Sequence, residues 1–518
     1  MAKKTNSSAK FNPNSSRNAV FSADVENEKV YPKFVEGIKF ENFRHIESLS
    51  VNFKKPVSVI AGSNKSGKTT VLLAIACSHF EFKKRNFSNG HVERHTWSDV
   101  IKTTPFDVQT VDWTYWLTTK TGAKRDTRRG QRKAQTNKWN GVGKKESQVK
   151  DVQAIYVDLD RVLPARYFSS TLLRKSVQAT ATSLSSKNQQ LIDDCLSYIF
   201  EDEYSVKRVA THGSEEVLGF TGSNSKYSSY NCASGEDVVS RILIDCIEAP
   251  NNSLILIDEI EIGLHPGIQR RLMDVIFHIS DEGQKQFIIT THSSTVLSSV
   301  PDTARIFIDR KDGRHETVCP VSLNAALSKM DSVNYPLVDL FCEDDVAEMI
   351  IKKALGIMNK KNVPGLTSKL VNVVISGSAN NTYDNFKVRK RTYGSVKIRS
   401  GHCCVLDGDM EAKKDSDGKP LFPADEFLHF LPGTVPPEKM LCDLYEKSNP
   451  NTKLRYHIQK SNVHCLFDKM MEHADFTSKV EAFEAAWSCF LNSPTHMAEL
   501  DGLIEFIEKV CRAYSPDL

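Results

Sequence analysis

The 518-residue chain contains no apolar run close to the roughly 20 residues that a membrane-spanning helix needs. Its start, from Met1 to about Asn27, is rich in serine, asparagine and lysine and has no apolar core, unlike a secretory signal. We therefore expect a cytoplasmic protein with no membrane segment. Residues 1–30 are expected to form a disordered tail, because such a composition buries too little apolar surface to fold.

Paired cysteines and strong charge are also missing. The twelve cysteines are scattered and form no C-x-x-C pair, which argues against a disulfide framework or a cysteine zinc site. The formal net charge is only +4, so any argument for nucleic-acid binding has to come from local clusters. No repeat of solenoid period is present. A chain of this length predicts two or three domains, each with its own core.

A phosphate-binding loop is the most specific motif present. Gly62–Thr70 reads G-x-x-x-x-G-K-T, preceded by an apolar strand over Pro56–Ala61 and followed by an apolar helix start. Lys68 would reach the β- and γ-phosphates of ATP, and the Thr69 hydroxyl would face Mg²⁺. A chance glycine turn is the competing interpretation, and the preceding strand argues against it. The predicted nucleotide ligands here are Gly62, Asn64, Lys65, Ser66, Gly67, Lys68, Thr69 and Thr70.

Further along, polar residues follow two buried strands. Asp258 and Glu259 end one apolar strand, and His292 follows the next. Asp258 would hold Mg²⁺ through water, Glu259 would orient the attacking water and His292 would sense the γ-phosphate. A lone acid pair at a strand end would be ordinary. Upstream, a helix N-terminus that could hold a phosphate is opened by Ser234, Gly235 and Glu236.

The C-terminal part repeats the alternation of strands and helices beyond a polar linker over residues 311–331. Glu343 follows one predicted strand, and Asp407-Gly-Asp409 follows another. Acids at the ends of parallel strands can gather at one sheet edge, where they bind hard divalent ions. Two such ions could cleave a phosphodiester. Solvated strand ends are the competing and, on composition alone, more common arrangement.

Two basic segments bear on nucleic acid. One precedes the Asp407 strand and could neutralise phosphates, with a solvated helix face as the alternative. It contains Lys387, Arg389, Lys390, Arg391, Lys397 and Arg399. The other, Lys120–Lys145, is interpreted as a mobile hairpin or loop. It is more often a solvated excursion than a contact with DNA or a partner.

The set of motifs resembles the ABC-type ATPases. The phosphate loop, Ser-Gly-Glu, the strand ending in Asp258-Glu259 and Thr-His-Ser occur in the order of that family. The segment Ile38–Arg44 is similar to the start of the branch that includes SMC, RecF and OLD proteins. The resemblance spans roughly residues 35–310 and departs slightly at Ala233. It implies homodimers or larger oligomers in which Ser234 and Gly235 of one subunit contact the γ-phosphate held by Lys68 of another.

The later acids resemble a Toprim domain, with Glu343, a glycine turn at Gly377 and the Asp407-x-Asp409 pair. An ATPase joined to Toprim is the architecture of OLD-family nucleases, in which Glu348 and Glu438 would be weaker metal ligands. Toprim domains usually carry glycine where Asp344 stands, which leaves Asp344 and Asp345 as possible substitutes. The catalytic lysine often found late in that family has no evident counterpart.

Together these patterns predict an α/β protein. An ABC-type ATPase domain over 31–325, with a basic and helical insertion at about 80–230, would precede a Toprim-like parallel domain over 332–440. A helical part would span 441–518. The resemblance implies an ATP-binding DNA endonuclease or nickase using Mg²⁺ or Mn²⁺, acting in phage defence. A reverse transcriptase with its RNA-linked DNA (msDNA), or a helicase-like protein, would be its partner. The alternatives are a RecF- or SMC-type DNA clamp with a non-cleaving Toprim domain and, disfavoured by the C-terminal half, a transporter ATPase.

Overall fold

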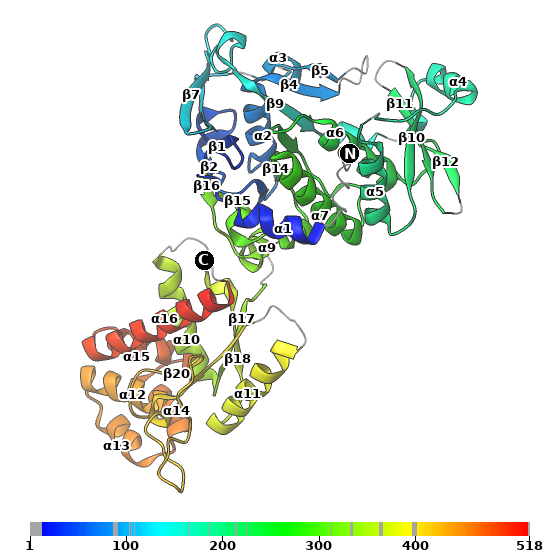
Figure 1. Cartoon of the computed structure of the whole chain (residues 1–518). Helices are drawn as coiled ribbons and strands as arrows, with labels where there is room; N and C mark the ends of the chain where they lie inside the picture. The colour runs from blue at the N-terminus through cyan, green and yellow to red at the C-terminus, as the bar shows by residue number, and fades with distance from the viewer. Residues whose placement is uncertain are drawn as a thin grey trace. The chain divides into compact units, whose positions relative to one another are not determined.

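The computed structural model divides the chain into two compact units, Met1–Met330 and Asp331–Leu518, which run from blue to green and from yellow-green to red in Figure 1. It describes residues 13–85, 92–102, 104, 106–107, 109–163, 165–185, 187–212, 215–223, 225–311, 313–331, 335–361, 366–395 and 401–515. Lys397, Arg399 and the first twelve positions of the expected tail lie outside these ranges. No helix among the described residues is both long and apolar enough to cross a bilayer.

The first unit is built on an eight-stranded sheet with the order β16-β15-β3-β14-β13-β9-β4-β5. Its six inner strands are parallel, and β5 and β16 join antiparallel at the edges. The predicted mixed, largely parallel α/β sheet is therefore confirmed. The strands are β3 Val57–Gly62, β4 His79–Arg85, β5 Val92–Arg94, β9 Val149–Val157, β13 Leu254–Ile257, β14 Gln286–Thr290, β15 Arg305–Lys311 and β16 Arg314–Val318.

Helix α2 (Lys68–Cys77) lies between this sheet and a second, antiparallel sheet (Figure 1). Its side chains are apolar nearly all round and buried, as expected for a helix covered on both faces. The second sheet has the order β2-β1-β6-β7-β8. Its strands are β1 Lys33–Phe43, β2 Ile46–Asn52, β6 Trp113–Thr121, β7 Lys124–Arg132 and β8 Trp139–Gly141.

The basic segment Lys120–Lys145 forms the β6–β7 hairpin and continues through β8, so the predicted hairpin is confirmed. It belongs to the five-stranded sheet, which corrects its interpretation as a solvated excursion. Lys120 is buried, and Arg125 Nε donates to Glu36 Oε1 of β1 at 2.8 Å. Trp139 stacks on Trp97 with ring centroids 4.3 Å apart. These aromatic and ionic contacts come from segments distant in sequence, so the basic run alone did not indicate them.

The expected helical insertion at about 80–230 is also corrected, because this region is mainly β-structure. It supplies β4, β5 and β9 to the central sheet, β6–β8 to the second sheet, and a third sheet with the order β10-β11-β12. The remaining elements are α3 Trp97–Val100, α4 Ser170–Gln178, α5 Gln189–Phe200, β10 Ser205–His212, β11 Glu215–Thr221 and β12 Lys226–Ser228.

Helices α6 (Ser234–Glu248) and α7 (Pro266–Gly283) lie on the side of the central sheet away from α2 (Figure 1). Helix α1 (Pro13–Ser22) packs on α7, with the Phe21 and Phe277 rings 5.1 Å apart. The expectation of a disordered tail is therefore wrong for its second half, because apolar contacts with α7 stabilise α1. The expected linker over 311–331 instead forms β16 and α9 (Leu323–Asp331), which follow α8 (Ser294–Ser298) in this unit.

The second unit contains a parallel sheet with the order β18-β17-β19-β20. Because the chain moves from β17 to one neighbour and then to the other, right-handed crossovers place α10 and α11 on opposite faces (Figure 1). The strands are β17 Val338–Cys342, β18 Val371–Ile375, β19 Gly401–Leu406 and β20 Leu428–Phe430, with α10 Asp345–Lys360 and α11 Ala379–Ser395.

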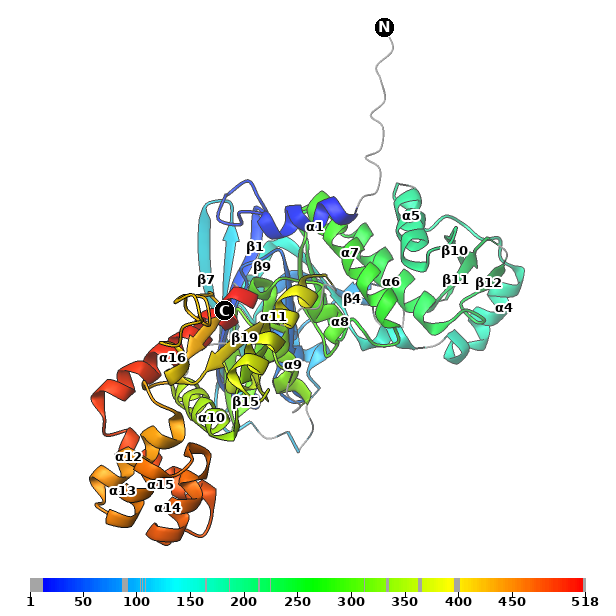
Figure 2. The same cartoon turned by 90° about the horizontal axis from the view of Figure 1, so that it is seen from below.

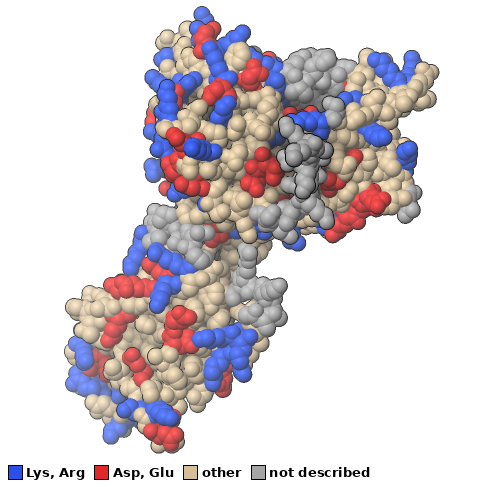
Figure 3. Space-filling model, in the orientation of Figure 1, with Lys and Arg blue, Asp and Glu red and all other residues tan. Residues whose placement is uncertain are grey.

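A group of helices follows the sheet. Four of them, α12 to α15, pack on one another (Figure 2), and α16 returns to the sheet beside α10. The bounds are α12 Pro437–Ser448, α13 Thr452–Lys460, α14 Leu466–Ala474, α15 Lys479–Phe490 and α16 Pro494–Tyr514. On the visible face of each unit, basic and acidic side chains are interspersed (Figure 3), in keeping with the mild net charge.

Candidate functional site

The phosphate loop joins the fully buried strand β3 to α2, and two of its glycines are required by space and backbone geometry. A Cβ on Gly62 would lie 2.4 Å from the Ile308 carbonyl oxygen. Gly67, at the N-terminus of α2, has φ +97°, and a Cβ there would lie 2.8 Å from Ile46 Cδ1. The loop therefore packs closely on β15 and β2, with the N–H groups at the start of α2 at its end.

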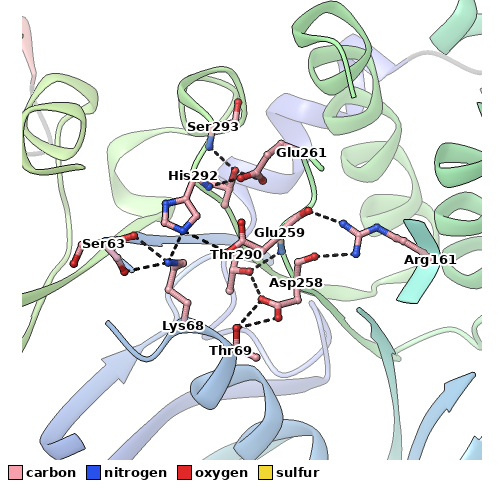
Figure 4. A network of polar contacts seen from close by, with 12 residues as sticks. Ser63, Lys68, Thr69, Arg161, Asp258, Glu259, Glu261, Thr290, His292 and Ser293 are labelled. Atoms are coloured by element: carbon pink, nitrogen blue, oxygen red, sulfur yellow. Dashed lines mark hydrogen bonds and ion pairs between the residues drawn. The ribbon is translucent and has the colours of Figure 1, made fainter. Parts of the chain in front are cut away.

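Lys68 lies at the centre of a polar network (Figure 4). Its Nζ donates to the Gly62 carbonyl at 3.0 Å and lies 2.8 Å from His292 Nε2. The same ring nitrogen lies 3.4 Å from Glu259 Oε1. The contact with His292 lowers the pKa of Glu259, which keeps this carboxylate ionised. Three residues predicted from separate motifs thus lie together beside the phosphate loop.

Asp258 is the second centre of the network. Thr69 Oγ1 donates to its Oδ2 at 3.0 Å, and Thr290 Oγ1 donates to its Oδ1 at 2.6 Å. The buried Ser66 Oγ has no hydrogen-bond partner among the described residues. A hydroxyl beside a carboxylate at the end of a phosphate loop is the donor set that holds Mg²⁺ of a bound nucleotide. The residues present therefore fit a nucleotide with its magnesium ion.

Glu259 is held in a strained backbone conformation by contacts that the sequence did not indicate. Its φ is +50°, and its N–H donates to Thr290 Oγ1 at 2.8 Å. Arg161 donates from its two terminal nitrogens to the carbonyls of Asp258 and Glu259, at 2.9 and 2.5 Å. Arg161 lies almost a hundred positions upstream in the supposed insertion, and no motif marks it. It fixes the peptide groups on either side of Glu259, and thereby the direction of that carboxylate.

A second residue that sequence reasoning missed is Glu261. Its carboxylate accepts from the His292 N–H at 2.5 Å and from Thr291 Oγ1 at 2.6 Å. These bonds tie the segment after β14 to the segment after β13, so that His292 stays beside Lys68. Glu261 resembles any polar loop residue in the sequence, because its partners are thirty positions away.

The three predicted residues at the start of α6 have different environments. Ser234 is exposed, and Gly235 abuts the loop after β13, where a Cβ would lie 3.2 Å from the Gly263 carbonyl oxygen. Both oxygens of Glu236 are already used, because they accept from the Ala233 N–H at 2.9 Å and from the Tyr227 hydroxyl at 2.7 Å. Glu236 therefore caps its own helix, while Ser234 remains accessible at the N-terminus.

In the second unit, the predicted acids from two strands meet in an open cleft of 670 Å³. Glu343 follows β17, and Asp407 and Asp409 follow the neighbouring β19. Glu343 Oε1 accepts from the Asp407 N–H at 2.8 Å. A Cβ on the intervening Gly408 would lie 1.9 Å from the Gly433 carbonyl oxygen, so the turn between the two aspartates requires glycine.

The electrostatics of this cleft suit a cation. Burial and then the charge of Glu343 raise the pKa of Asp407 to about 9, and burial raises the pKa of Glu343. Asp407 Oδ1 and Asp409 Oδ1 are buried without a hydrogen-bond partner in the described part of the chain. Buried carboxylate oxygens without partners are costly unless a cation compensates them. The donor set therefore fits a divalent metal ion.

The weaker predicted ligands are distributed unevenly. Glu348 lies on α10, pairs with Lys352 at 2.8 Å and does not line the cleft. Glu438 is buried at the start of α12, 3.1 Å from His464 Nδ1. Asp344 is the N-cap of α10, with an extended φ of −144°, so glycine is not needed at this position. Lys413, not predicted, lines the cleft 3.1 Å from Asp409 Oδ2.

Four of the six predicted basic residues before the Asp407 strand lie on α11 and are exposed: Lys387, Arg389, Lys390 and Arg391. The N-terminus of this helix, at Ala379, borders the cleft. At about 1.5 Å per residue, the basic side chains begin about 12 to 18 Å along the helix. Lys387 and Lys390 pair with Asp384 and Asp425, so part of this charge is already compensated.

Residues 57–298 match the family model described as "AAA domain, putative AbiEii toxin, Type IV TA system". No curated protein matches the chain. The chain is similar to the SMC head domain from Thermotoga maritima, at 12% identity and a TM-score of 0.34 over 55% of this chain and 98% of that chain. It is similar to the Smc head domain bound to the C-terminal domain of ScpA from Pyrococcus furiosus, at 12% identity and 0.37 over 57% and 98%.

The recombination mediator protein RecF of the RecFOR pathway is similar at 12% identity and a TM-score of 0.33, over 55% of this chain and 98% of that chain. Likenesses at these identities and TM-scores indicate no function for the present chain. The family match is the finding that bears on activity. Residues 57–298, which carry the phosphate loop, Asp258 and His292, form an ATPase domain.

Proposed function

We propose that the chain is an ATP-dependent DNA endonuclease or nickase that uses Mg²⁺ or Mn²⁺ and that its second unit is the nuclease. The observation that carries this proposal is the cleft into which Glu343, Asp407 and Asp409 project from adjacent parallel strands. Two of these carboxylates have buried oxygens without partners in the described structure. Buried carboxylate oxygens without partners destabilise a fold, which supports a role for this cluster in binding a cation.

The chemistry follows from the groups in the cleft. A divalent ion held by carboxylates supplies positive charge to a phosphodiester and generates a nucleophile from water. Glu343, Asp407 and Asp409 would hold the ion, and the ammonium of Lys413, 3.1 Å from Asp409, could pair with a phosphate oxygen. The exposed basic side chains of α11 would contact phosphates on one side of the cleavage point.

The ATPase unit would control cutting by pairing head to tail. Ser234 is exposed and Gly235 partly exposed at the N-terminus of α6, where backbone N–H groups and the helix dipole favour an anion. A second copy could offer this terminus to the γ-phosphate beside Lys68 and His292. The ABC-type order of motifs supports this arrangement, in which ATP binding assembles the oligomer that positions the nuclease units.

Plasmid cleavage by the purified full chain tests the nuclease proposal. Supercoiled DNA incubated with ATP and Mg²⁺ or Mn²⁺ is expected to become nicked or linear. Asp407→Ala should abolish this, whereas Asp417→Ala removes the same kind of side chain from an exposed position in the following loop and should not. Cleavage that survives Asp407→Ala would overturn the assignment. ATP-dependent DNA binding without any cleavage would instead favour a RecF- or SMC-type clamp.

Sedimentation of the Glu259→Gln variant tests the pairing, because loss of this carboxylate should preserve bound ATP. Addition of ATP should shift the protein from monomer to dimer, and Ser234→Arg should prevent the shift. Ser170→Arg, at the exposed first residue of α4, is the matched control. An equal response of both arginine variants would refute the proposed interface.

The resemblance to OLD-family nucleases extends the proposal to bacterial defence against phage. Its partner would be a reverse transcriptase with msDNA or a helicase-like protein. Plaque counts on cells carrying the wild type or Asp407→Ala, with and without the neighbouring genes, test this extension. Equal plaque counts on cells with the wild type and on cells with Asp407→Ala would contradict a defence role that depends on cleavage.

A further inference from the structure

Three potential metal ligands lie together at the cleft, which Asp344 and His464 line and beside which Glu438 is buried. Asp344 caps α10, Glu438 lies in the first turn of α12, and His464 lies in the 3₁₀ turn Val463–Cys465 before α14. One ligand atom of each lies within 4.8 Å of the other two. Ligands on one ion at about 2.1 Å lie about 3 Å apart in adjacent positions and about 4.2 Å apart in opposite positions. A small inward movement would therefore bring the three onto a single ion.

Each of these side chains is already oriented. Asp344 uses Oδ1 to accept from the Val346 and Ala347 N–H groups at 3.0 and 2.9 Å, which leaves Oδ2 for another partner. Glu438 is 4% exposed, and His464 is its single polar contact in the described part of the chain. The His464 ring is 75% exposed, so one face of the group stays open to solvent. Asp344 and Glu438 are thus held by the fold, while His464 leaves the group accessible to an ion from solvent.

The neighbouring Asp407 points independently to a missing ligand. It is 7% exposed, it lines the cleft, and its Oδ1 has no partner among the described residues. Both Asp344 and Glu438 lie close enough to act on its charge. Glu343 and Asp409 also act on its charge, so an Asp407 oxygen could be shared between two ions, as bridging carboxylates are in two-metal sites.

The net charge of the carboxylates at the cleft also favours a second cation. Four carboxylates line the cleft, the buried Glu438 is a fifth close to Asp407, and Lys413 is a permanent positive charge that lines the cleft with them. Fully ionised, these groups carry a net charge of about −4, which two divalent cations would neutralise. One ion at Glu343, Asp407 and Asp409 leaves half of this charge uncompensated. A second position is therefore favoured on the side where Asp344 and Glu438 lie.

We propose that Asp344, Glu438 and His464 form a second cation position, and that it prefers first-row transition-metal ions such as Mn²⁺ to Mg²⁺. Mg²⁺ binds oxygen ligands almost exclusively and loses its waters reluctantly, whereas imidazole nitrogen suits transition metals. His464 would thus determine which metal the cleft accepts. The inference rests on the proposed function for its biological meaning, but metal binding can be measured without cleavage.

Electron paramagnetic resonance titration of the nucleotide-free full chain with Mn²⁺ tests the proposal. The wild type should bind two Mn²⁺ ions, and one of them should show nitrogen hyperfine coupling. His464→Ala should lose that coupling and weaken one Mn²⁺ by at least about tenfold, the scale expected when a group that sets metal affinity is removed. Mg²⁺ affinity should change by less than about threefold. His212→Ala, which removes an exposed imidazole from the first unit, is the control.

Asp344→Asn provides a second variant, because asparagine also caps a helix and the fold should be kept. It should weaken the same Mn²⁺ as His464→Ala does. Two unaltered Mn²⁺ sites in both variants, or no nitrogen coupling in the wild type, would overturn the inference while leaving the nuclease proposal intact. Nitrogen-coupled Mn²⁺ binding by a protein that never cleaves DNA would support the inference and contradict the nuclease.

Discussion

Arg161 gives the sharpest test of how the ATPase site is built. The residue is 7% exposed, and its guanidinium donates to the carbonyls of Asp158, Asp258 and Glu259 at 2.6, 2.9 and 2.5 Å. Two of these bonds flank Glu259, whose φ of +50° costs about 1 kcal/mol or more for a residue with a side chain. Arg161→Ala removes the groups that hold this conformation.

The expected loss of kcat can be estimated from one hydrogen bond between Arg161 and the backbone beside Glu259. A hydrogen bond that involves a charged group contributes about 1.5 to 3 kcal/mol. If the productive position of Glu259 depends on one such bond, its loss should lower kcat for ATP hydrolysis by about 10- to 100-fold, since 1.36 kcal/mol is tenfold. Nucleotide affinity should stay within about threefold, because Arg161 contacts backbone carbonyls and not the phosphate loop. Arg161→Lys keeps the positive charge but lacks the paired N–H donors of the guanidinium. Its kcat should therefore lie between those of the wild type and Arg161→Ala.

The assay combines steady-state phosphate release with binding of a fluorescent ATP analogue. Arg174→Ala on α4 removes an exposed arginine from the same region and should behave as the wild type does. Thermal unfolding of each variant shows whether a lower kcat comes from loss of the fold or from a displaced Glu259 carboxylate. A folded Arg161→Ala protein that keeps kcat within about threefold would refute the positioning role, as would an equal loss of affinity and kcat.

Three further outcomes are expected. Burial lowers the pKa of His79 to about 4, so acid favours the unfolded chain, which takes up this proton near pH 6.5. Between about pH 7.5 and about pH 5 the wild type should lose about 2 kcal/mol more unfolding free energy in urea than His79→Gln does. Gly408→Ala should weaken Mn²⁺ binding and cost about 1 to 3 kcal/mol, because its Cβ meets the Gly433 carbonyl oxygen; calorimetry measures both. Asp237→Ala removes the ion-pair partner of the buried Arg241, which keeps its hydrogen bond to the Glu216 carbonyl, and should cost about 3 kcal/mol in the same urea assay. Equal pH dependence, unchanged Mn²⁺ affinity or unchanged stability, respectively, would contradict these expectations.

Several elements were not predictable because distant contacts stabilise them. Helix α1 has a polar composition, and its order comes from packing against α7. The basic run Lys120–Lys145 looks solvated until Trp139 stacks on Trp97 and Arg125 reaches Glu36. In each case the local composition indicated disorder or a loop, and a partner far along the chain outweighed that tendency.

The sequence by itself determined the phosphate loop and the short acid motifs, because each needs only a few adjacent residues between a strand and a turn or helix. Spacing along the chain sets their backbone geometry. Only the tertiary structure established the contacts through which the predicted motifs share a site. Sheet order brings Asp258 to Thr69, and Glu343 to Asp407. It also decided the contacts of Arg161 with Glu259 and of Glu438 with His464, because groups separated by many residues meet only when the elements that carry them pack together.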